Sequence, residues 1–307
     1  MLFEYSLNHR IIFIVDEYPY LAESILSASS ELQALIDMYK DRSRLFLILC
    51  GSSMSFMEHQ VLGHKSPLYG RRTAQYKIKP FTYLEMRDMV PNRSFEECAL
   101  IYGFTGGVVE YISHIHSDQS VDDAIIDLFY KPSGRLVEEP ANLLKQELRE
   151  PRQYNNILSA IENFSGASAY ETYVKPMLPQ FMGPVFERMA YEYVGYRIQR
   201  GTIPFIPHSY GTWWGTDNTT KQQVEIDILA LGESKPSPNT SPQPLALLGE
   251  CKWRNEPVKP VILEKLIEKG RCIYGAAYYW LFSKSGYTFT NTNPDIELIT
   301  LENMYKI

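Results

Sequence analysis

Two acidic residues and a lysine in the last third of the chain have the types and spacing needed for phosphodiester chemistry. Asp227 lies in the segment 224–231, and Glu250 and Lys252 stand two residues apart in a later segment. Carboxylates can hold one or two Mg²⁺ ions, which activate a bound water and neutralise transition-state charge, while an ammonium group positions the nucleophile. Asp227 and Glu250 are therefore candidate metal ligands, and Lys252 is a candidate partner of the nucleophile.

Two strands are expected to position these residues. Alternating apolar and polar residues over 224–231 predict one strand, and the apolar run 245–253 predicts a second after a proline-rich loop. Residues two apart in a strand share a face, so Glu250 and Lys252 should lie together. Antiparallel pairing of the two strands could place Asp227 beside them.

A helix is expected to precede these strands. Apolar residues recur at helical spacing over 182–194 and place Glu187 on the flank of a buried stripe. Glu187 is therefore a further candidate catalytic residue, which could support a second metal ion.

A second group of candidate residues follows two apolar runs near the start of the chain. The run 11–15 ends in Asp16 and Glu17, and the run 45–50 ends in Gly51 and Ser52. Each run is typical of a strand buried on both faces of a parallel sheet, and a helix is expected between them. Ligands in open α/β sheets bind beyond the carboxyl ends of the strands, where Asp16, Glu17 and Ser52 should meet.

These runs resemble motifs of P-loop ATPases of the AAA class. An apolar strand ending in Asp-Glu resembles the Walker B motif, and the second strand resembles the one carrying sensor 1. The resemblance implies that Asp16 holds Mg²⁺ through its water shell, Glu17 orients or deprotonates the attacking water and Ser52 senses the γ-phosphate. ATP with Mg²⁺ is thus the ligand implied for intact relatives.

The resemblance extends towards residue 115. The segment 67–73 resembles one in an archaeal-type subgroup, which implies that an arginine, Arg71 or the nearly equivalent Arg72, approaches a nucleotide phosphate. A strand is expected over 75–78, and Thr82 and Ser94, each followed three residues later by glutamate, predict two helix starts. The turn 104–107 before the apolar run 108–112 resembles the family's Gly-Gly turn into a lid helix, which implies a helical lid.

One essential ATPase motif is missing. The sequence G-x-x-x-x-G-K-[ST], whose backbone amides and lysine cradle nucleotide phosphates, does not occur in the chain. Ten residues precede the Walker-B-like run. We therefore expect an N-terminally truncated ATPase module without a Walker A motif, and the loss of ATPase activity.

The second half also resembles a known module. The runs 183–187, 213–214, 225–227 and 249–253 resemble, in this order, the C-terminal module of uncharacterised function attached to archaeal-type AAA ATPases. Its acids and E-x-K pair are similar to those of the PD-(D/E)xK nuclease superfamily. The resemblance implies Mg²⁺ as cofactor and DNA as a possible partner.

The predicted fold class is α/β. A partial P-loop NTPase parallel sheet with a helical lid is expected first, followed by an α/β restriction-endonuclease-like domain. We expect residues 1–118 to form the partial ATPase core and lid and residues 181–307 the nuclease-like domain. Between them, residues 119–180 should form a helical linker with a remnant winged helix, because 151–161 resembles the opening helix of such a domain.

The composition restricts the possible partners. Thirty basic and 36 acidic residues give a net charge of -6, which argues against a broad DNA-coating surface. Nucleic-acid contact should therefore be local, and the segment 250–271 carries six basic and four acidic residues. Dispersed cysteines and histidines indicate no zinc site, and the lack of a long apolar run or export signal indicates a cytoplasmic protein without a membrane segment. The sequence does not determine the oligomeric state.

Two functions remain open at this stage. In the first, the C-terminal half is a metal-dependent nuclease, a hydrolase with Asp227, Glu250, Lys252 and Glu187 as its catalytic residues. The alternative is a non-catalytic regulatory or DNA- or protein-binding remnant of an ATPase gene. Metal-dependent cleavage of DNA distinguishes them.

The missing phosphate cradle leads to a first prediction. Isothermal titration of the purified chain with MgATP should show no binding in the micromolar range, because the amides and lysine that make most phosphate contacts are absent. Micromolar affinity for MgATP would contradict this expectation.

Overall fold

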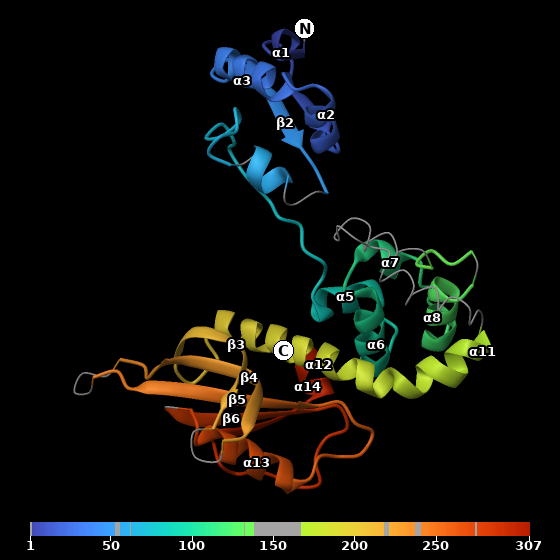
Figure 1. Ribbon diagram of the computed structural model, residues 1–307, viewed down its shortest axis with the longest axis vertical. Helices are drawn as coiled ribbons and strands as arrows, with labels where there is room; N and C mark the ends of the chain where they lie inside the picture. Colours follow the sequence, from blue (N-terminus) through green and yellow to red (C-terminus); the bar gives the residue numbers. More distant parts are fainter. Residues whose placement is uncertain are drawn as a thin grey trace. The chain divides into compact units, whose positions relative to one another are not determined.

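The computed structural model of this chain describes residues 2–52, 56–61, 63–131, 133–137, 167–217, 221–236, 241–273 and 275–307. The chain divides into two compact units, residues 1–78 and 79–307, which are described separately (Figure 1). No helix within the described ranges is long and apolar enough to cross a lipid bilayer.

The first unit is built on two parallel strands. These strands, β1 (Ile11–Val15) and β2 (Leu45–Leu49), are connected through α2 (Tyr18–Ser24) and α3 (Ala28–Tyr39). A short helix α1 (Leu2–Tyr5) precedes the sheet, and a π-helical turn η1 (Met57–Val61) follows it. The predicted strand–helix–strand order is therefore confirmed.

The burial predicted for β1 is wrong. Ile12 and Ile14 are 64% and 56% exposed, and Phe46, the register partner of Ile12 on β2, is 58% exposed. The unit has a small core in which Leu32 and Ile36 of α3 take part. In the described part of the unit, Val15 and Leu49 pack with α3 in this core, whereas the sheet face carrying Ile12 and Ile14 is exposed and is not covered by a helix as in a sheet buried on both faces.

The strand predicted at 75–78 is also absent from the structure. This segment has no regular secondary structure and pairs with no strand among the described residues, and Ile78 is 90% exposed. Alternating polar and apolar residues form a strand only where a neighbouring strand can complete the backbone hydrogen bonds.

The second unit is organised round a five-stranded mixed sheet in the order β3-β4-β5-β6-β7. The first three strands, β3 (Ile206–Thr216), β4 (Gln223–Glu233) and β5 (Pro244–Lys252), are antiparallel neighbours. The last two, β6 (Ala276–Ser283) and β7 (Ile296–Thr300), continue the sheet parallel to β5. Thus β4 and β5 confirm the two strands predicted to carry the acidic residues.

Two helices lie on opposite sides of this sheet (Figure 1). The long helix α12 (Leu178–Gln199) buries its apolar stripe in the main core with Leu247 and Cys251 of β5. On the other side, α13 (Pro260–Gly270) packs Leu266 against Ile226 and Leu248. Because alternate residues of β5 point to opposite faces, this layering sends Glu250 and Lys252 to the α13 side.

Four short helices form the N-terminal part of the second unit. These are α5 (Tyr83–Met89), α6 (Phe95–Thr105), α7 (Val109–Ser113) and α8 (Val121–Phe129), and the predicted capping boxes at Thr82 and Ser94 are present. Their buried residues join the same core as the sheet, so the packing boundary follows Ile78, whereas the sequence-based division was placed after residue 118. The segment 151–161, expected as a winged-helix remnant, lies outside the described residues.

The remaining described elements precede α12 or follow the last strand, β7. A helical stretch leads into α12 through α11 (Ala167–Ala169), η2 (Tyr170–Val174) and η3 (Lys175–Met177). At the C-terminus, α14 (Leu301–Tyr305) packs against α6.

Glu192 of α12 joins the short helices to the sheet layer. Its Oε2 accepts the Tyr83 N–H at the start of α5 over 3.0 Å, and its Oε1 accepts the Tyr102 hydroxyl of α6 over 2.6 Å. The Tyr83 hydroxyl in turn donates to the Met304 carbonyl in α14 over 2.8 Å. One carboxylate therefore satisfies polar groups from two helices at a largely apolar interface.

Replacing Glu192 tests this connection. Glu192→Ala should lower the free energy of unfolding by about 2 kcal/mol, because it leaves the buried Tyr102 hydroxyl without its acceptor. Urea denaturation should show this loss, whereas the exposed Glu264→Ala should change stability by less than about 0.5 kcal/mol. Equal midpoints for the two variants would contradict the role assigned to Glu192.

Candidate functional site

The candidate site lies where β4 and β5 stop pairing. Their antiparallel register reaches Ile228 opposite Gly249, and Asp227 and Glu250 come immediately beyond that pair, one on each strand. β5 remains paired with β6 as far as Lys252. From Glu250 to Lys252, β5 is therefore hydrogen-bonded to β6 on one side, and on the other side its backbone is not paired with β4.

A side-chain hydrogen bond bridges the two strands at this point. Asp227, which is only 8% exposed, accepts the backbone N–H of Cys251 at its Oδ2 over 2.7 Å. The bond satisfies an N–H that strand pairing leaves free and fixes the aspartate beside Glu250. The structure thus brings together the residues expected to meet.

Glu250 is held between two lysines. Its Oε1 is 2.5 Å from the Lys252 Nζ, which also donates to the Cys251 carbonyl over 3.0 Å. Its Oε2 is 2.7 Å from the Nζ of Lys269, which projects from α13. Burial favours the neutral acid, but the charges and hydrogen bonds of the two lysines outweigh it and lower the pKa of Glu250.

The pKa values of the two other acids near Glu250, Glu187 and Asp227, are raised. Burial raises the pKa of Glu187 to about 7, and the nearby charges of Asp227 and Glu225 add to the rise. Burial also raises the pKa of Asp227 to about 6, helped by the charge of Glu250 and opposed by the Cys251 hydrogen bond. Glu187 of α12 therefore belongs to the same electrostatic cluster as the strand residues.

Sequence reasoning did not identify Lys269 or Glu225 as members of the site. Lys269 lies in a charge-alternating stretch that resembles an ordinary solvated helix face, and its contact with Glu250 depends on how α13 packs on the sheet. Glu225 was recognisable only by its position two residues before Asp227 in the strand.

The donor atoms suit a hard divalent cation, although the side chains are not arranged as a metal cage. Within the described part of the chain, no three or more histidine, cysteine, aspartate or glutamate residues are grouped closely enough to hold a metal ion. Both oxygens of Glu250 are taken by ammonium groups. Carboxylate oxygens are nevertheless the ligands that Mg²⁺ prefers. Burial is the main cause of the raised pKa values of Glu187 and Asp227, and a cation would relieve the repulsion between carboxylates that adds to it.

The residues expected at the nucleotide also cluster, at the end of the two-stranded sheet. The Glu17 N–H donates to Oδ1 of Asp16 over 3.0 Å, and the Ser52 N–H donates to Oε2 of Glu17 over 3.5 Å. Glu17 adopts a left-handed backbone conformation with φ of 47°, which costs energy for a residue with a side chain. Asp16, Glu17 and Ser52 thus meet as the strand order predicted.

Comparison with known proteins matches two families to this chain. Residues 3–115 match the model of a family described as an ATPase domain predominantly from Archaea. The chain carries an ATPase-family domain. Residues 154–265, which include all four predicted catalytic residues, match a family described as archaea bacterial proteins of unknown function.

The chain is also similar to one uncharacterized archaeal protein. An uncharacterized protein of Methanocaldococcus jannaschii is 25% identical over 319 residues, covering 80% of this chain and 68% of that protein. No solved structure matches the chain.

Arg71 is placed differently from the other predicted residues of the ATPase-family domain. Its Nε and Nη2 form a two-point ion pair with Asp37 of α3, at 2.9 Å and 2.7 Å, and its Nη1 donates to the Pro67 carbonyl. The guanidinium therefore anchors its own loop to α3 in this structure.

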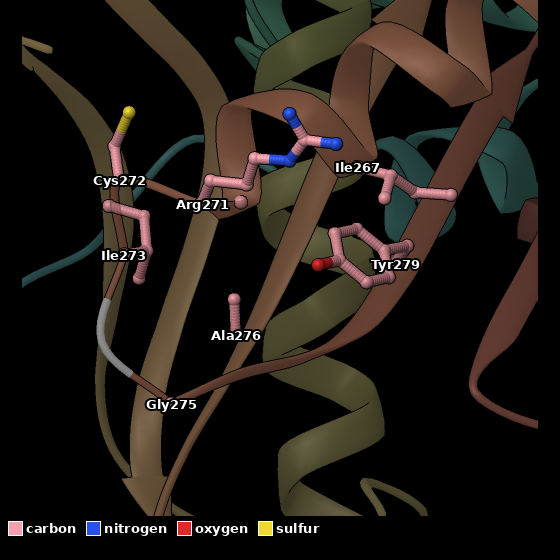
Figure 2. Close-up of a pocket in the computed structure, with 8 residues that line it drawn as sticks. Ile267, Arg271, Cys272, Ile273, Gly275, Ala276 and Tyr279 are labelled. Carbon is pink, nitrogen blue, oxygen red and sulfur yellow. The ribbon is translucent and has the colours of Figure 1, made fainter. Parts of the chain in front are cut away.

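A separate open pocket of about 580 Å³ lies at the C-terminal end of α13. Figure 2 shows the Arg271 guanidinium and the Tyr279 ring beside this pocket, with Cys272 and Ile273 on the opposite side. None of the acids or lysines of the candidate site lines it.

The raised pKa of Glu187 predicts a pH-dependent stability. Folding raises this pKa from 4.5 to about 7, so the folded state binds the proton more tightly, and the stability gained at low pH is lost as the pH rises through this range. Glu187→Gln should therefore lose less stability between pH 5 and pH 8 than the wild type, and should be the more stable protein at pH 8. Urea midpoints at both pH values measure this.

The matched control for this experiment is Glu264→Gln, which alters an exposed glutamate on α13. It should follow the wild-type pH dependence. If the Glu187→Gln and wild-type midpoints change in parallel, Glu187 does not have the raised pKa described above.

Proposed function

We propose that the domain following the ATPase-family domain is a divalent-cation-dependent nuclease that hydrolyses phosphodiester bonds in DNA. The observation that carries this proposal is the convergence of Asp227, Glu250 and Lys252 where two strands part, with Glu187 contributed by the helix on the other face. Acids and a lysine in such an arrangement are the groups that metal-assisted hydrolysis requires.

Asp227 and Glu250 have different roles in this reaction. Asp227 is fixed through one oxygen by the Cys251 N–H, so its position is set before any ligand binds. Glu250 supplies the second carboxylate and orients the two lysines. A Mg²⁺ ion held by these acids would lower the pKa of a bound water and neutralise charge that develops on the phosphate.

Lys252 and Glu187 act on the attacking water. The Lys252 ammonium uses two of its three donors on Glu250 and Cys251, which leaves one for the water or a phosphate oxygen. Glu187, whose pKa is about 7, has the proton affinity of a general base that works near neutral pH.

The burial of this cluster also supports a functional role. Placing mutually repelling carboxylates in a partly buried position costs stability, and strongly perturbed groups gather at sites where the charge is used. No comparable observation favours the non-catalytic alternative.

Cleavage of DNA tests the proposal. The wild type should nick supercoiled plasmid or cut single-stranded circular DNA with Mg²⁺ or Mn²⁺, and EDTA should abolish the activity. Asp227→Ala and Lys252→Ala should each reduce the rate by at least about 100-fold, because each removes a group that acts on the reacting atoms. Gel electrophoresis measures the products.

Lys265→Ala is the matched control, because Lys265 is an exposed lysine on α13 one turn from Lys269. This variant should cut as the wild type does. Absence of metal-dependent cleavage by the wild type, or full activity in Asp227→Ala, would overturn the proposal.

A further inference from the structure

One tryptophan of the chain is exposed, and it lies beside the candidate site. Trp214 is 77% exposed on β3, an edge strand of the five-stranded sheet, whereas Trp253 and Trp280 are 8% and 3% exposed. Its neighbour Trp213 packs against the apolar cluster beneath α13. Trp213 therefore accounts for the packing at this edge, and the Trp214 ring contributes little to the core.

The strand register places Trp214 close to the acids. Trp214 is paired with Glu225 on β4, and side chains of such pairs lie about 5 Å apart at Cβ. Glu225 is an electrostatic neighbour of Glu187 and precedes Asp227 by two residues. Two residues of strand rise, taken at right angles to this spacing, give a separation of about 8 Å between the backbones of Trp214 and Asp227.

A second aromatic group lies on the same side of β3. Tyr210 precedes Trp214 by four residues, a distance of about 13 Å along a strand, and residues at this spacing share a face. Its ring is stacked on Tyr191 of α12, with centroids 4.5 Å apart and planes inclined by 23°. Tyr191 is itself 40% exposed. Accessible aromatic rings therefore extend from the acids along the sheet edge.

We propose that Trp214 stacks on a base of single-stranded nucleic acid bound at this site, with the Tyr210–Tyr191 pair as a second contact. This inference rests on the proposed function and specifies its substrate class. Every base has a π-face, so aromatic stacking holds single strands without reading their sequence. Bases inside a duplex are already stacked on one another and do not offer these faces to a side chain.

Binding of labelled oligonucleotides tests this inference. Fluorescence anisotropy with Ca²⁺ in place of Mg²⁺ compares a dT oligonucleotide, an rU oligonucleotide and a DNA duplex. Ca²⁺ still neutralises the acids, but its looser coordination geometry differs from the octahedral geometry of Mg²⁺, and gel electrophoresis checks that the probes stay intact. Trp214→Ala should weaken binding of the single strands about 10-fold, while Trp214→Phe should restore most of the affinity because it keeps an aromatic ring. Duplex binding should be unchanged, and the dT and rU arms show whether DNA or RNA is preferred.

Ile206→Ala is the matched control, because Ile206 is a 43% exposed residue on the same strand. It should bind all three probes as the wild type does, and urea denaturation should show that every variant is folded. Wild-type affinity of Trp214→Ala for both single strands, equal losses for single strands and duplex, or no single-strand binding by the wild type would each overturn the inference.

The two proposals can fail separately. Metal-dependent cleavage together with unchanged single-strand binding by Trp214→Ala would reject the stacking role and leave the nuclease in place. Single-strand binding that depends on Trp214 in a protein that cuts no DNA would support the stacking role and reject the nuclease.

Discussion

The hydrogen bond from the Cys251 N–H to Asp227 determines the geometry of the candidate site. It forms where the backbone pairing of β4 and β5 ends, so the Asp227 carboxylate accepts the hydrogen bond that a backbone carbonyl of β4 would accept in a regular ladder. A buried N–H without an acceptor would be costly, and a buried carboxylate without a donor more so. The separation of the strands and the position of the acid are therefore stabilised by one contact.

The neighbouring charges and the burial of each acid determine the protonation of Glu250, Glu187 and Asp227. Glu250 remains ionised because Lys252 and Lys269 approach its two oxygens. Burial makes Glu187 and Asp227 hold their protons more tightly, and no lysine or arginine among the described residues forms an ion pair with either. Acids that lie close together in one cluster thus differ in proton affinity. Such a difference allows one carboxylate to bind charge while another exchanges a proton.

The sequence predicted the strands carrying Asp227, Glu250 and Lys252, because alternation and the two-residue spacing are local properties. It also predicted the meeting of Asp16, Glu17 and Ser52, which follows from parallel strand order. The Lys269 contact, the pairing of Arg71 with Asp37 and the exposure of β1 were not predictable in this way. Each depends on how separate elements pack, and periodicity along one element contains no information about its neighbours.

The exposed face of the two-stranded sheet indicates that the first unit unfolds locally more easily than the second. The first unit has few buried residues, centred on Tyr18, Val61 and Leu68, whereas the core of the second unit joins a sheet to several helices. Regions with few buried apolar contacts open at lower free energy than the rest of a protein. Amide protons of β1 and β2 should therefore exchange with solvent through openings that leave β4 and β5, and the acids they carry, intact.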